Sequence, residues 1–247
     1  MIYSEYSQRK NMEIDYQSIN HRYEIQAGWT ENFQRRLLRG LHTPPPWKVL
    51  EIGCGTGAFL RNLQKISSSN FSFWGLDIDF HALIFADKQK KDQWICGDGN
   101  SLPLNSDSFD LILCHYYLLW IPDPVKVLNE MKRCCKLQGT IAVAAEPDYG
   151  GRIDFPESMQ VNGVKQTEAL SNAGIDPLAG RKLLHWMIQA GFTNPVIGIH
   201  GVERYFDQQC QFISEEKFQC RIDLNSQNFH LALQESNQNE IFFIPTF

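Results

Sequence analysis

The stretch V-L-E-I-G-C-G-T-G, at residues 49–57, decides the fold of this chain. An apolar run that stops in a turn with glycine at alternate positions is typical of a buried strand entering a tight loop. Glycine lacks a Cβ, so it adopts positive φ easily and lets a ligand lie against the backbone. The following residues, 58–63, place apolar side chains at helical spacing. Together these features predict the first strand, turn and helix of a nucleotide-type βαβ unit.

The acid and the glycines of this stretch form the pattern E-x-G-x-G-x-G, from Glu51, Gly53, Gly55 and Gly57. This pattern resembles motif I of class I S-adenosylmethionine-dependent methyltransferases. The resemblance implies that Glu51 orients the loop and helps to hold the methionine end of the cofactor. It also implies that the backbone of the turn, Cys54 included, approaches the cofactor closely.

Two other functions stay open at this point. Gly53, Gly55 and Ala58 also fit the dinucleotide-binding pattern G-x-G-x-x-G/A, so an NAD(P)-dependent Rossmann oxidoreductase is an alternative. That alternative requires residues arranged for hydride transfer. A third hypothesis is a non-catalytic module that binds S-adenosylmethionine. Residues downstream of the turn favour the methyltransferase.

The second predicted strand covers residues 71–77 and ends in an acid, Asp77. It lies roughly 20 residues beyond the glycine turn, where a ribose-binding acid is expected. Asp79 is the alternative acid, but it precedes a helical pattern at residues 80–86 and suits an N-cap better. The resemblance implies that Asp77 binds the ribose hydroxyls and that Ile78 contacts the cofactor.

The third predicted strand, residues 93–96, leads into G-D-G-N-S-L-P at residues 97–103. This segment resembles the G-D-x-x-x-L-P stretch of the same family. The resemblance implies that Asp98 accepts a hydrogen bond from the adenine amino group and that Gly99 lies against the cofactor. An Asp between two glycines is also common in plain turns, which is the alternative interpretation.

The fourth predicted strand, residues 107–114, resembles motif IV, whose end faces the transferable methyl group. The resemblance implies cofactor contacts by Cys114 and His115 at this end, with Tyr116 and Tyr117 shaping an aromatic wall. His115 is also a candidate acid or base. A single histidine at a strand end is more often a hydrogen-bonded structural residue.

The fifth predicted strand, residues 140–145, follows a helix that begins at Pro124, after the N-cap Asp123, and ends at Gly139. Glu146 and Asp148 come directly after this strand, where they could take a proton from an acceptor. The alternative is that Arg152 or a lysine pairs with them as part of the loop structure.

The N-terminal residues 1–46 are predicted to be a helical lead-in, with apolar side chains at roughly helical spacing and Gly40 near the end. In similar methyltransferases an N-terminal helix covers the amino-acid end of the cofactor. Trp29 or Tyr23 could do so here, although simple packing on the sheet explains both residues as well.

Residues 47–247 are predicted to form one methyltransferase domain with insertions at about 147–178 and 203–239. The first insertion is loop-rich and is expected to cover the substrate; the second is expected to be a helical pair. Strands six and seven are predicted at residues 196–199 and 241–244. The resemblance implies a Rossmann-like α/β three-layer sandwich, with a seven-stranded, mostly parallel sheet whose last strand is antiparallel.

The composition narrows the choice of partners. A net charge of −5 gives no global basic field for nucleic acid, and no apolar run approaches the roughly 20 residues that span a bilayer. Seven cysteines without a C-x-x-C pattern suit a reducing, cytoplasmic location and predict no metal site. The resemblance extends to quinone-biosynthesis C-methyltransferases, which implies a small-molecule acceptor but does not identify it. The oligomeric state stays open.

Overall fold

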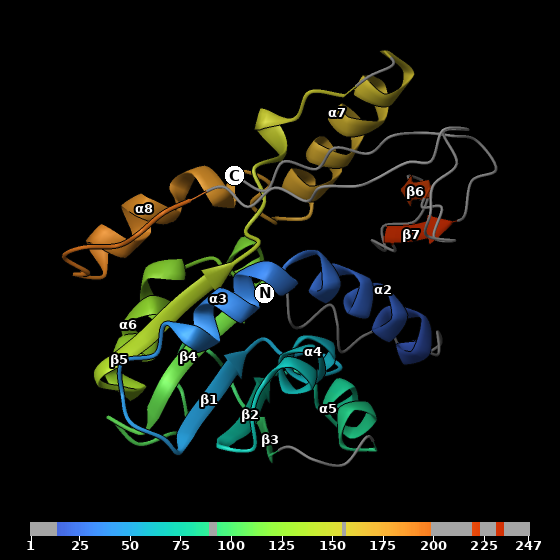
Figure 1. The fold of residues 1–247 in the computed structure, drawn as a ribbon. Coiled ribbons are helices and arrows are strands. Elements are labelled where there is room, and N and C mark those ends of the chain that lie inside the picture. Colours follow the sequence, from blue (N-terminus) through green and yellow to red (C-terminus); the bar gives the residue numbers. More distant parts are fainter. Residues whose placement is uncertain (1–13, 89–92, 155–156, 199–218, 223–230, 235–247) are drawn as a thin grey trace, which may run out of the picture.

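The computed structural model describes residues 14–88, 93–154, 157–198, 219–222 and 231–234, and the statements below concern these residues. The sheet strands are β1 (Trp47–Ile52), β2 (Phe71–Asp77), β3 (Gln93–Cys96), β4 (Phe109–His115) and β5 (Cys135–Ala144). The α-helices are α2 (Tyr16–Trp29), α3 (Glu31–Arg39), α4 (Ala58–Ile66), α5 (Phe80–Asp87), α6 (Pro124–Cys134), α7 (Glu157–Asn172) and α8 (Ala179–Gln189). Two short 3-10 helices, η1 (Leu118–Trp120) and η2 (Tyr149–Gly151), follow β4 and β5. Figure 1 shows their arrangement.

The five strands form one parallel sheet in the order β3-β2-β1-β4-β5. The chain builds outward from β1 to β3 and then returns to place β4 on the other side of β1. The order of the strands therefore reverses between β1 and β4. In open α/β sheets, ligands bind at the carboxyl ends of the strands beside such a reversal. The glycine turn after β1 and the residues after β4 meet at this position.

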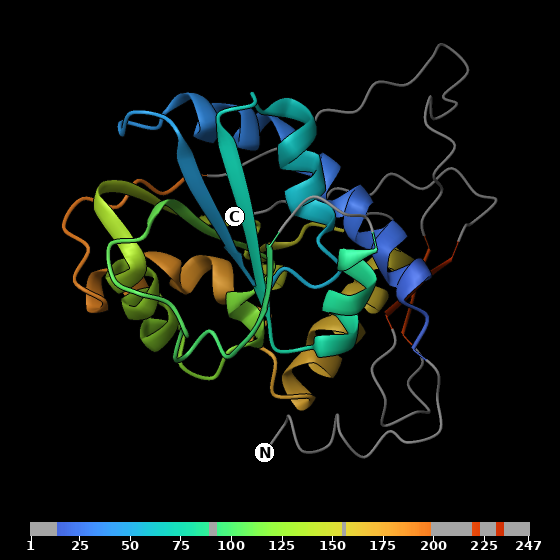
Figure 2. The ribbon, with the colours of Figure 1, turned by 90° about the horizontal axis from the view of Figure 1, so that it is seen from below.

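Helices cover both faces of the sheet (Figures 1 and 2). On one face, β1 side chains such as Val49 pack with Leu63 of α4 and Ala27 of α2. On the other face, Leu50 and Ile52 pack with Met131 of α6 and Met187 of α8. Since β1 is packed on both sides, four of its six residues are apolar: Trp47, Val49, Leu50 and Ile52. Three layers with a Rossmann-like parallel sheet confirm that part of the prediction.

Two of the predicted helix starts are confirmed by their capping bonds. The Asp79 carboxylate accepts hydrogen bonds from the backbone N–H groups of His81 and Ala82 at the start of α5. Asp123 caps α6 by accepting from Lys126 N, with Pro124 at the first helical position. Within the predicted N-terminal lead-in, residues 16–39 form α2 and α3, which Thr30 separates. Within the described ranges, no helix has the length and apolar character needed to cross a bilayer.

The prediction of a seven-stranded sheet with an antiparallel last strand is wrong for the residues that the structure describes, because their main sheet has five strands, all parallel. Residues 196–198 of the predicted sixth strand are not in a strand. Val196 is 96% exposed, so this apolar stretch gains little by burial. Residue 199 and the predicted seventh strand, 241–244, lie outside the described residues.

Three further segments also differ from the predictions. The helix before β5 ends at Cys134 instead of Gly139, because Cys135 already pairs with Phe109 and residues 136–139 form an irregularity in the ladder. The predicted loop-rich insertion contains α7. Where the structure describes the predicted helical pair at 203–239, it has two antiparallel strands, β6 (Gln219–Ile222) and β7 (Leu231–Gln234). The rest of that range lies outside the described residues.

Candidate functional site

The glycine turn after β1 is held by backbone hydrogen bonds to the end of β2. Gly53 N and Cys54 N both donate to Leu76 O, at 2.8 and 3.1 Å. Gly53, Gly55 and Gly57 have φ values of 72°, 50° and 76°, in the region that favours glycine. The sequence thus places glycine where the backbone requires positive φ.

Three aromatic rings pack against this turn. The ring of Tyr23, on α2, lies beside Gly55, and the indole of Trp94, on β3, covers Gly57. The ring of Tyr117 lies against Gly53. A Cβ at Gly53 or Gly57 would overlap these rings, so part of the space above the turn belongs to the protein itself. Of the two candidates on α2, Tyr23 lies beside the turn, while Trp29 is the half-buried last residue of the helix.

Asp77, at the end of β2, is bonded directly to the glycine turn. Its Oδ2 accepts from Gly55 N at 2.7 Å, and its Oδ1 accepts from Asp79 N at 2.8 Å. Burial raises the pKa of Asp77 against the effect of these N–H donors. The next residue, Ile78, is 44% exposed. Asp79 instead caps α5 and accepts from the Tyr16 hydroxyl at 2.9 Å, as its position in the sequence suggested.

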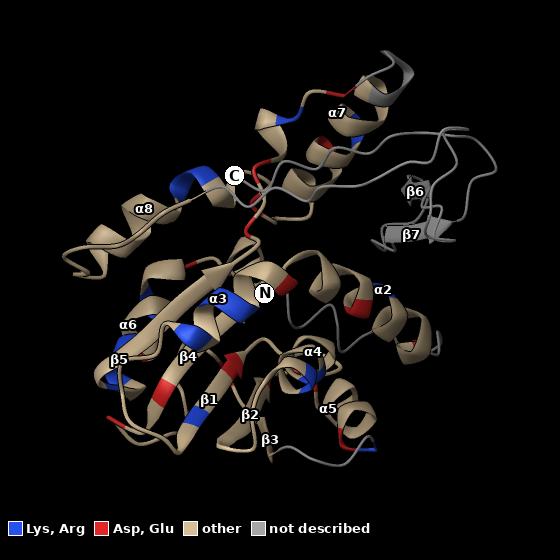
Figure 3. Cartoon of the chain, viewed as in Figure 1, with Lys and Arg blue, Asp and Glu red and all other residues tan. Residues whose placement is uncertain are grey.

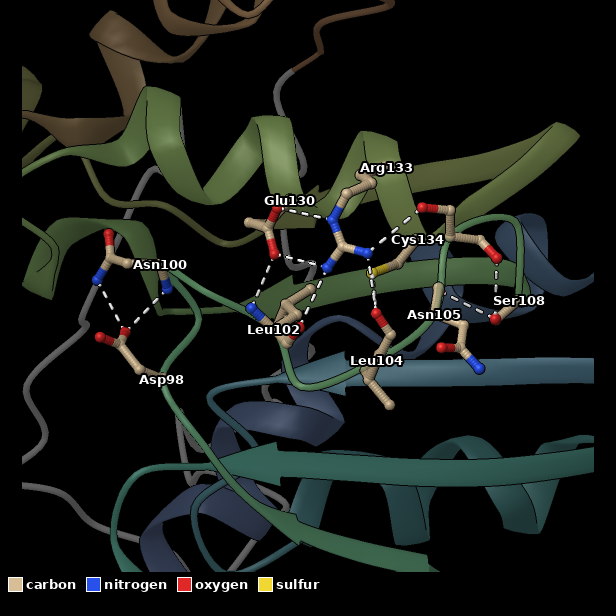
Figure 4. Close-up of polar contacts among 10 residues, drawn as sticks. Asp98, Asn100, Leu102, Leu104, Asn105, Ser108, Glu130, Arg133 and Cys134 are labelled. Atoms are coloured by element: carbon tan, nitrogen blue, oxygen red, sulfur yellow. Dashed lines mark hydrogen bonds and ion pairs between the residues drawn. The ribbon is translucent and has the colours of Figure 1, made fainter.

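The segment that follows β3 is fastened to α6 (Figure 4). Arg133 donates to Leu104 O at 2.8 Å and to Leu102 O at 3.1 Å. Glu130 accepts from Leu102 N at 2.8 Å and forms an ion pair with Arg133 at 2.7 Å. The same arginine and hydrogen bonds hold the pKa of Glu130 below its usual value. Neither residue was expected in this role from the sequence.

Asp98 and Gly99 lie at the start of this fastened segment. The exposed Asp98 carboxylate accepts from Asn100 N and Asn100 Nδ2, at 2.8 and 2.9 Å, in a turn (Figure 4). Gly99 is buried, and the Tyr117 hydroxyl lies where its Cβ would be. Tyr117 therefore contacts the turns that follow β1 and β3.

The end of β4 carries Cys114 and His115. Nε2 of His115 lies 3.3 Å from Oγ1 of Thr30, which links β4 to the junction of α2 and α3. Because Thr30 Oγ1 donates to Ala27 O at 3.1 Å, the histidine is the donor in this contact. Burial lowers the pKa of His115 to about 3, so the ring is neutral near pH 7. Phe59 and Tyr116 pack on it, with ring centroids at 4.5 and 4.8 Å.

The two acids after β5 have different partners. Glu146 is 3% exposed and accepts three backbone hydrogen bonds from the residues after β4. Burial raises its pKa to about 7, against the effect of these three N–H donors. Asp148 forms an ion pair with Arg181 at 2.7 Å, while the nearby Arg152 pairs with Asp154. The alternative interpretation, in which these acids form structural ion pairs, therefore holds for Asp148, but its partner is Arg181 and not Arg152.

The electrostatics of this edge suit a cationic ligand. Burial raises the pKa of the Cys114 thiol well above its usual value, and the carboxylates of Glu146 and Glu51 raise it further. Cys114 is therefore a neutral thiol that senses two buried acids. Figure 3 shows the acidic end of β1, where Glu51 is 2% exposed. With Asp77 at the next strand end, this donor set fits the sulfonium and ribose of S-adenosylmethionine.

Sequence comparison supports the same family. Residues 50–143 match the family model described as "Methyltransferase domain". A demethylmenaquinone methyltransferase of Lactobacillus johnsonii is 26% identical over 192 residues, which cover 70% of this chain and 79% of that protein. An uncharacterized protein of Methanocaldococcus jannaschii is 36% identical over 108 residues, 43% of this chain and 44% of its own length. The first listed curated relatives are matched over about half of their length, for example 56% of an uncharacterized methyltransferase of Schizosaccharomyces pombe.

Solved structures share the fold. A protein of Methanococcus maripaludis assigned as an S-adenosyl-L-methionine-dependent methyltransferase has a TM-score of 0.56 at 16% identity, over 77% of this chain and 92% of its own. The YcgJ protein of Bacillus subtilis has a TM-score of 0.52 at 19% identity, over 70% and 74% of the two chains. Identities this low support the fold alone. Residues 50–143 therefore resemble a methyltransferase domain, and the solved structures support the same fold.

Proposed function

We propose that the protein transfers a methyl group from S-adenosylmethionine to a small-molecule acceptor and releases S-adenosylhomocysteine. The observation that carries this proposal is the hydrogen bond between Gly55 N and the Asp77 carboxylate, at 2.7 Å. It joins the glycine turn to the acid at the next strand end, which supports one ligand contacting both.

Different residues of this edge bind different parts of the cofactor. In the proposal Glu51 lies under the methionine end, Asp77 takes the ribose hydroxyls and Asp98 takes the adenine amino group. A carboxylate offers about four acceptor positions, and the backbone uses two at Asp77, which leaves capacity for two hydroxyls. The turn residues Gly53, Cys54, Gly55 and Gly57 and the residues Ile78 and Gly99 supply the adjoining surface.

The chemistry asks little of the protein beyond geometry. S-adenosylmethionine supplies a methyl group that its sulfonium already activates for in-line displacement. The protein holds the acceptor in line with the methyl group and excludes water. Holding the reacting groups in the correct geometry greatly increases the rate of such a reaction. Trp29, Cys114, His115 and Tyr116 are the residues that we propose for the walls near the methyl group. Aromatic faces also favour the sulfonium cation.

Proton transfer from the acceptor has two candidates, His115 and Glu146. With a pKa of about 3, His115 is a weak base. It suits a methyl acceptor that needs only a hydrogen bond to the histidine and no strong base to remove its proton. With a pKa of about 7, Glu146 has suitable basicity, but its oxygens already accept three backbone hydrogen bonds. We therefore propose His115 as the group nearer to the acceptor.

Charge and relatives both favour a small molecule. The net charge of −5 gives no field that attracts nucleic acid. Several relatives are named demethylmenaquinone methyltransferase, which supports a quinone-like or phenolic acceptor class.

The test is the release of S-adenosylhomocysteine from S-adenosylmethionine with a panel of phenolic, quinol and amine acceptors. The proposal predicts release that depends on one acceptor class and a methylated product of the expected mass. Binding of S-adenosylhomocysteine without turnover on any panel member or on a metabolite extract would favour the non-catalytic module. Binding of NAD in its place would favour the oxidoreductase.

A further inference from the structure

Strands β4 and β5 leave the sheet at the same level through residues in an unusual backbone conformation. Tyr116 and Ala145 have φ values of 51° and 59°. Tyr116 N donates to Ala144 O at 3.1 Å, just before both chains turn. Residues other than glycine rarely adopt this region, so the surrounding structure must hold both turns in place.

The carboxylate of Glu146 stabilises the turn after β4 through hydrogen bonds. Its Oε1 accepts from Tyr117 N at 2.9 Å and Leu118 N at 2.7 Å, and its Oε2 accepts from Leu119 N at 3.0 Å. These are the first N–H groups of η1, which lack partners within the helix. Glu146 thus caps η1 from the segment that follows β5.

The turn that Glu146 holds carries Tyr117 into the candidate cofactor site. Its ring lies against Gly53 and its hydroxyl against Gly99, and a Cβ on either glycine would come within 3.0 Å of Tyr117. The two glycines follow β1 and β3, which are separated by β2 in the sheet. Tyr117 therefore bridges the two turns that the proposed cofactor must lie on.

We propose that Glu146 is a positioning residue for cofactor binding, which acts by fixing the turn at residues 116–119 so that Tyr117 braces the turns after β1 and β3. The inference rests on the proposed function, since it concerns how the S-adenosylmethionine site is kept in shape. It assigns the buried acid to the shape of the cofactor site, in place of proton transfer from the acceptor.

The test compares Glu146→Gln with a matched control, Asp110→Asn. Asp110 is also a buried acid, 2% exposed, and accepts from Lys48 N and Lys136 Nζ at the opposite end of β4. Glutamine keeps the size of Glu146 but turns an NH₂ group toward the backbone donors. Titration calorimetry with S-adenosylhomocysteine and hydrogen exchange at residues 117–119 are the readouts. We expect Glu146→Gln to weaken binding at least tenfold and to speed exchange at these amides, while Asp110→Asn keeps wild-type affinity.

A second variant keeps the proposal testable if Glu146→Gln does not fold. Because Glu146 acts through Tyr117, Tyr117→Ala must also weaken binding of S-adenosylhomocysteine at least tenfold. The double variant must lose less binding free energy than the two single variants lose when added together. Wild-type affinity in Glu146→Gln, with a fall confined to the rate of methyl transfer, would overturn the inference and assign Glu146 to the acceptor. Absence of binding by the wild-type protein would instead overturn the proposed function.

Discussion

The most informative substitution at the proposed cofactor site is Asp77→Asn. Asparagine has the shape of aspartate, but it replaces one oxygen with an NH₂ group that cannot accept. In the structure one oxygen faces Gly55 N at 2.7 Å and the other faces Asp79 N at 2.8 Å. The substitution therefore removes one backbone bond and at least one acceptor for a ribose hydroxyl. Hydrogen bonds to charged groups contribute roughly 1.5–3 kcal/mol each, so the affinity should fall by about 10- to 100-fold.

The assay is titration calorimetry with S-adenosylhomocysteine at pH 7.5, with Asp79→Asn as the matched control. Asp79 lies two residues away and caps α5, a role that asparagine also fills, so its substitution should leave the affinity within about threefold of wild type. If Asp77→Asn binds as tightly as Asp79→Asn, the carboxylate does not hold the ribose, and the assignment of this strand end is refuted.

Three further outcomes follow from the site. His115→Gln should lose about 2 kcal/mol less stability than wild type between pH 7 and pH 5 in urea unfolding, because the unfolded histidine takes up a proton that the folded one, with its pKa of about 3, does not; equal losses would contradict the buried environment. Gly57→Ala should cost roughly 1–3 kcal/mol in the same assay, since φ is 76° and Trp94 fills the space of the Cβ; a neutral effect would contradict this packing. Arg133→Ala should speed hydrogen exchange at the Leu102 amide, because its acceptor Glu130 is positioned by the ion pair with Arg133; unchanged exchange would show that other contacts fasten this segment.

The local chemistry of the first strands was accessible from the sequence. The glycine turn needs positive φ at three positions, and only a few residue types tolerate this, so the sequence pattern was specific. Asp79 and Asp123 could be assigned as caps because the cap lies next to the helix that it starts. These features depend on neighbours in the chain.

Long-range contacts were less accessible. Tyr117 was expected in an aromatic wall, but no local pattern indicated that it bridges the turns after β1 and β3. The hold of Glu146 on the turn spans 27 to 29 residues. The fastening of residues 102–104 by Arg133 likewise depends on tertiary packing. An arginine three residues after a glutamate predicts a helical ion pair, and its further bonds to a loop carry no sequence signal.

The errors in the sheet have a similar cause. Residues 196–199 are apolar enough for a strand, but a strand also needs an edge to pair with and a surface to cover it. Val196 is 96% exposed, so its propensity is not accompanied by burial. The end of the helix after Asp123 was misplaced at Gly139, because pairing of Cys135 with β4 ends the helix before the glycine.

We propose that one edge of the sheet binds S-adenosylmethionine. Titration calorimetry of the wild-type protein with S-adenosylhomocysteine, and separately with NAD, tests it directly. We expect saturable binding of S-adenosylhomocysteine near one equivalent per chain and no heat of binding with NAD. Binding of NAD, or of neither compound, would contradict it.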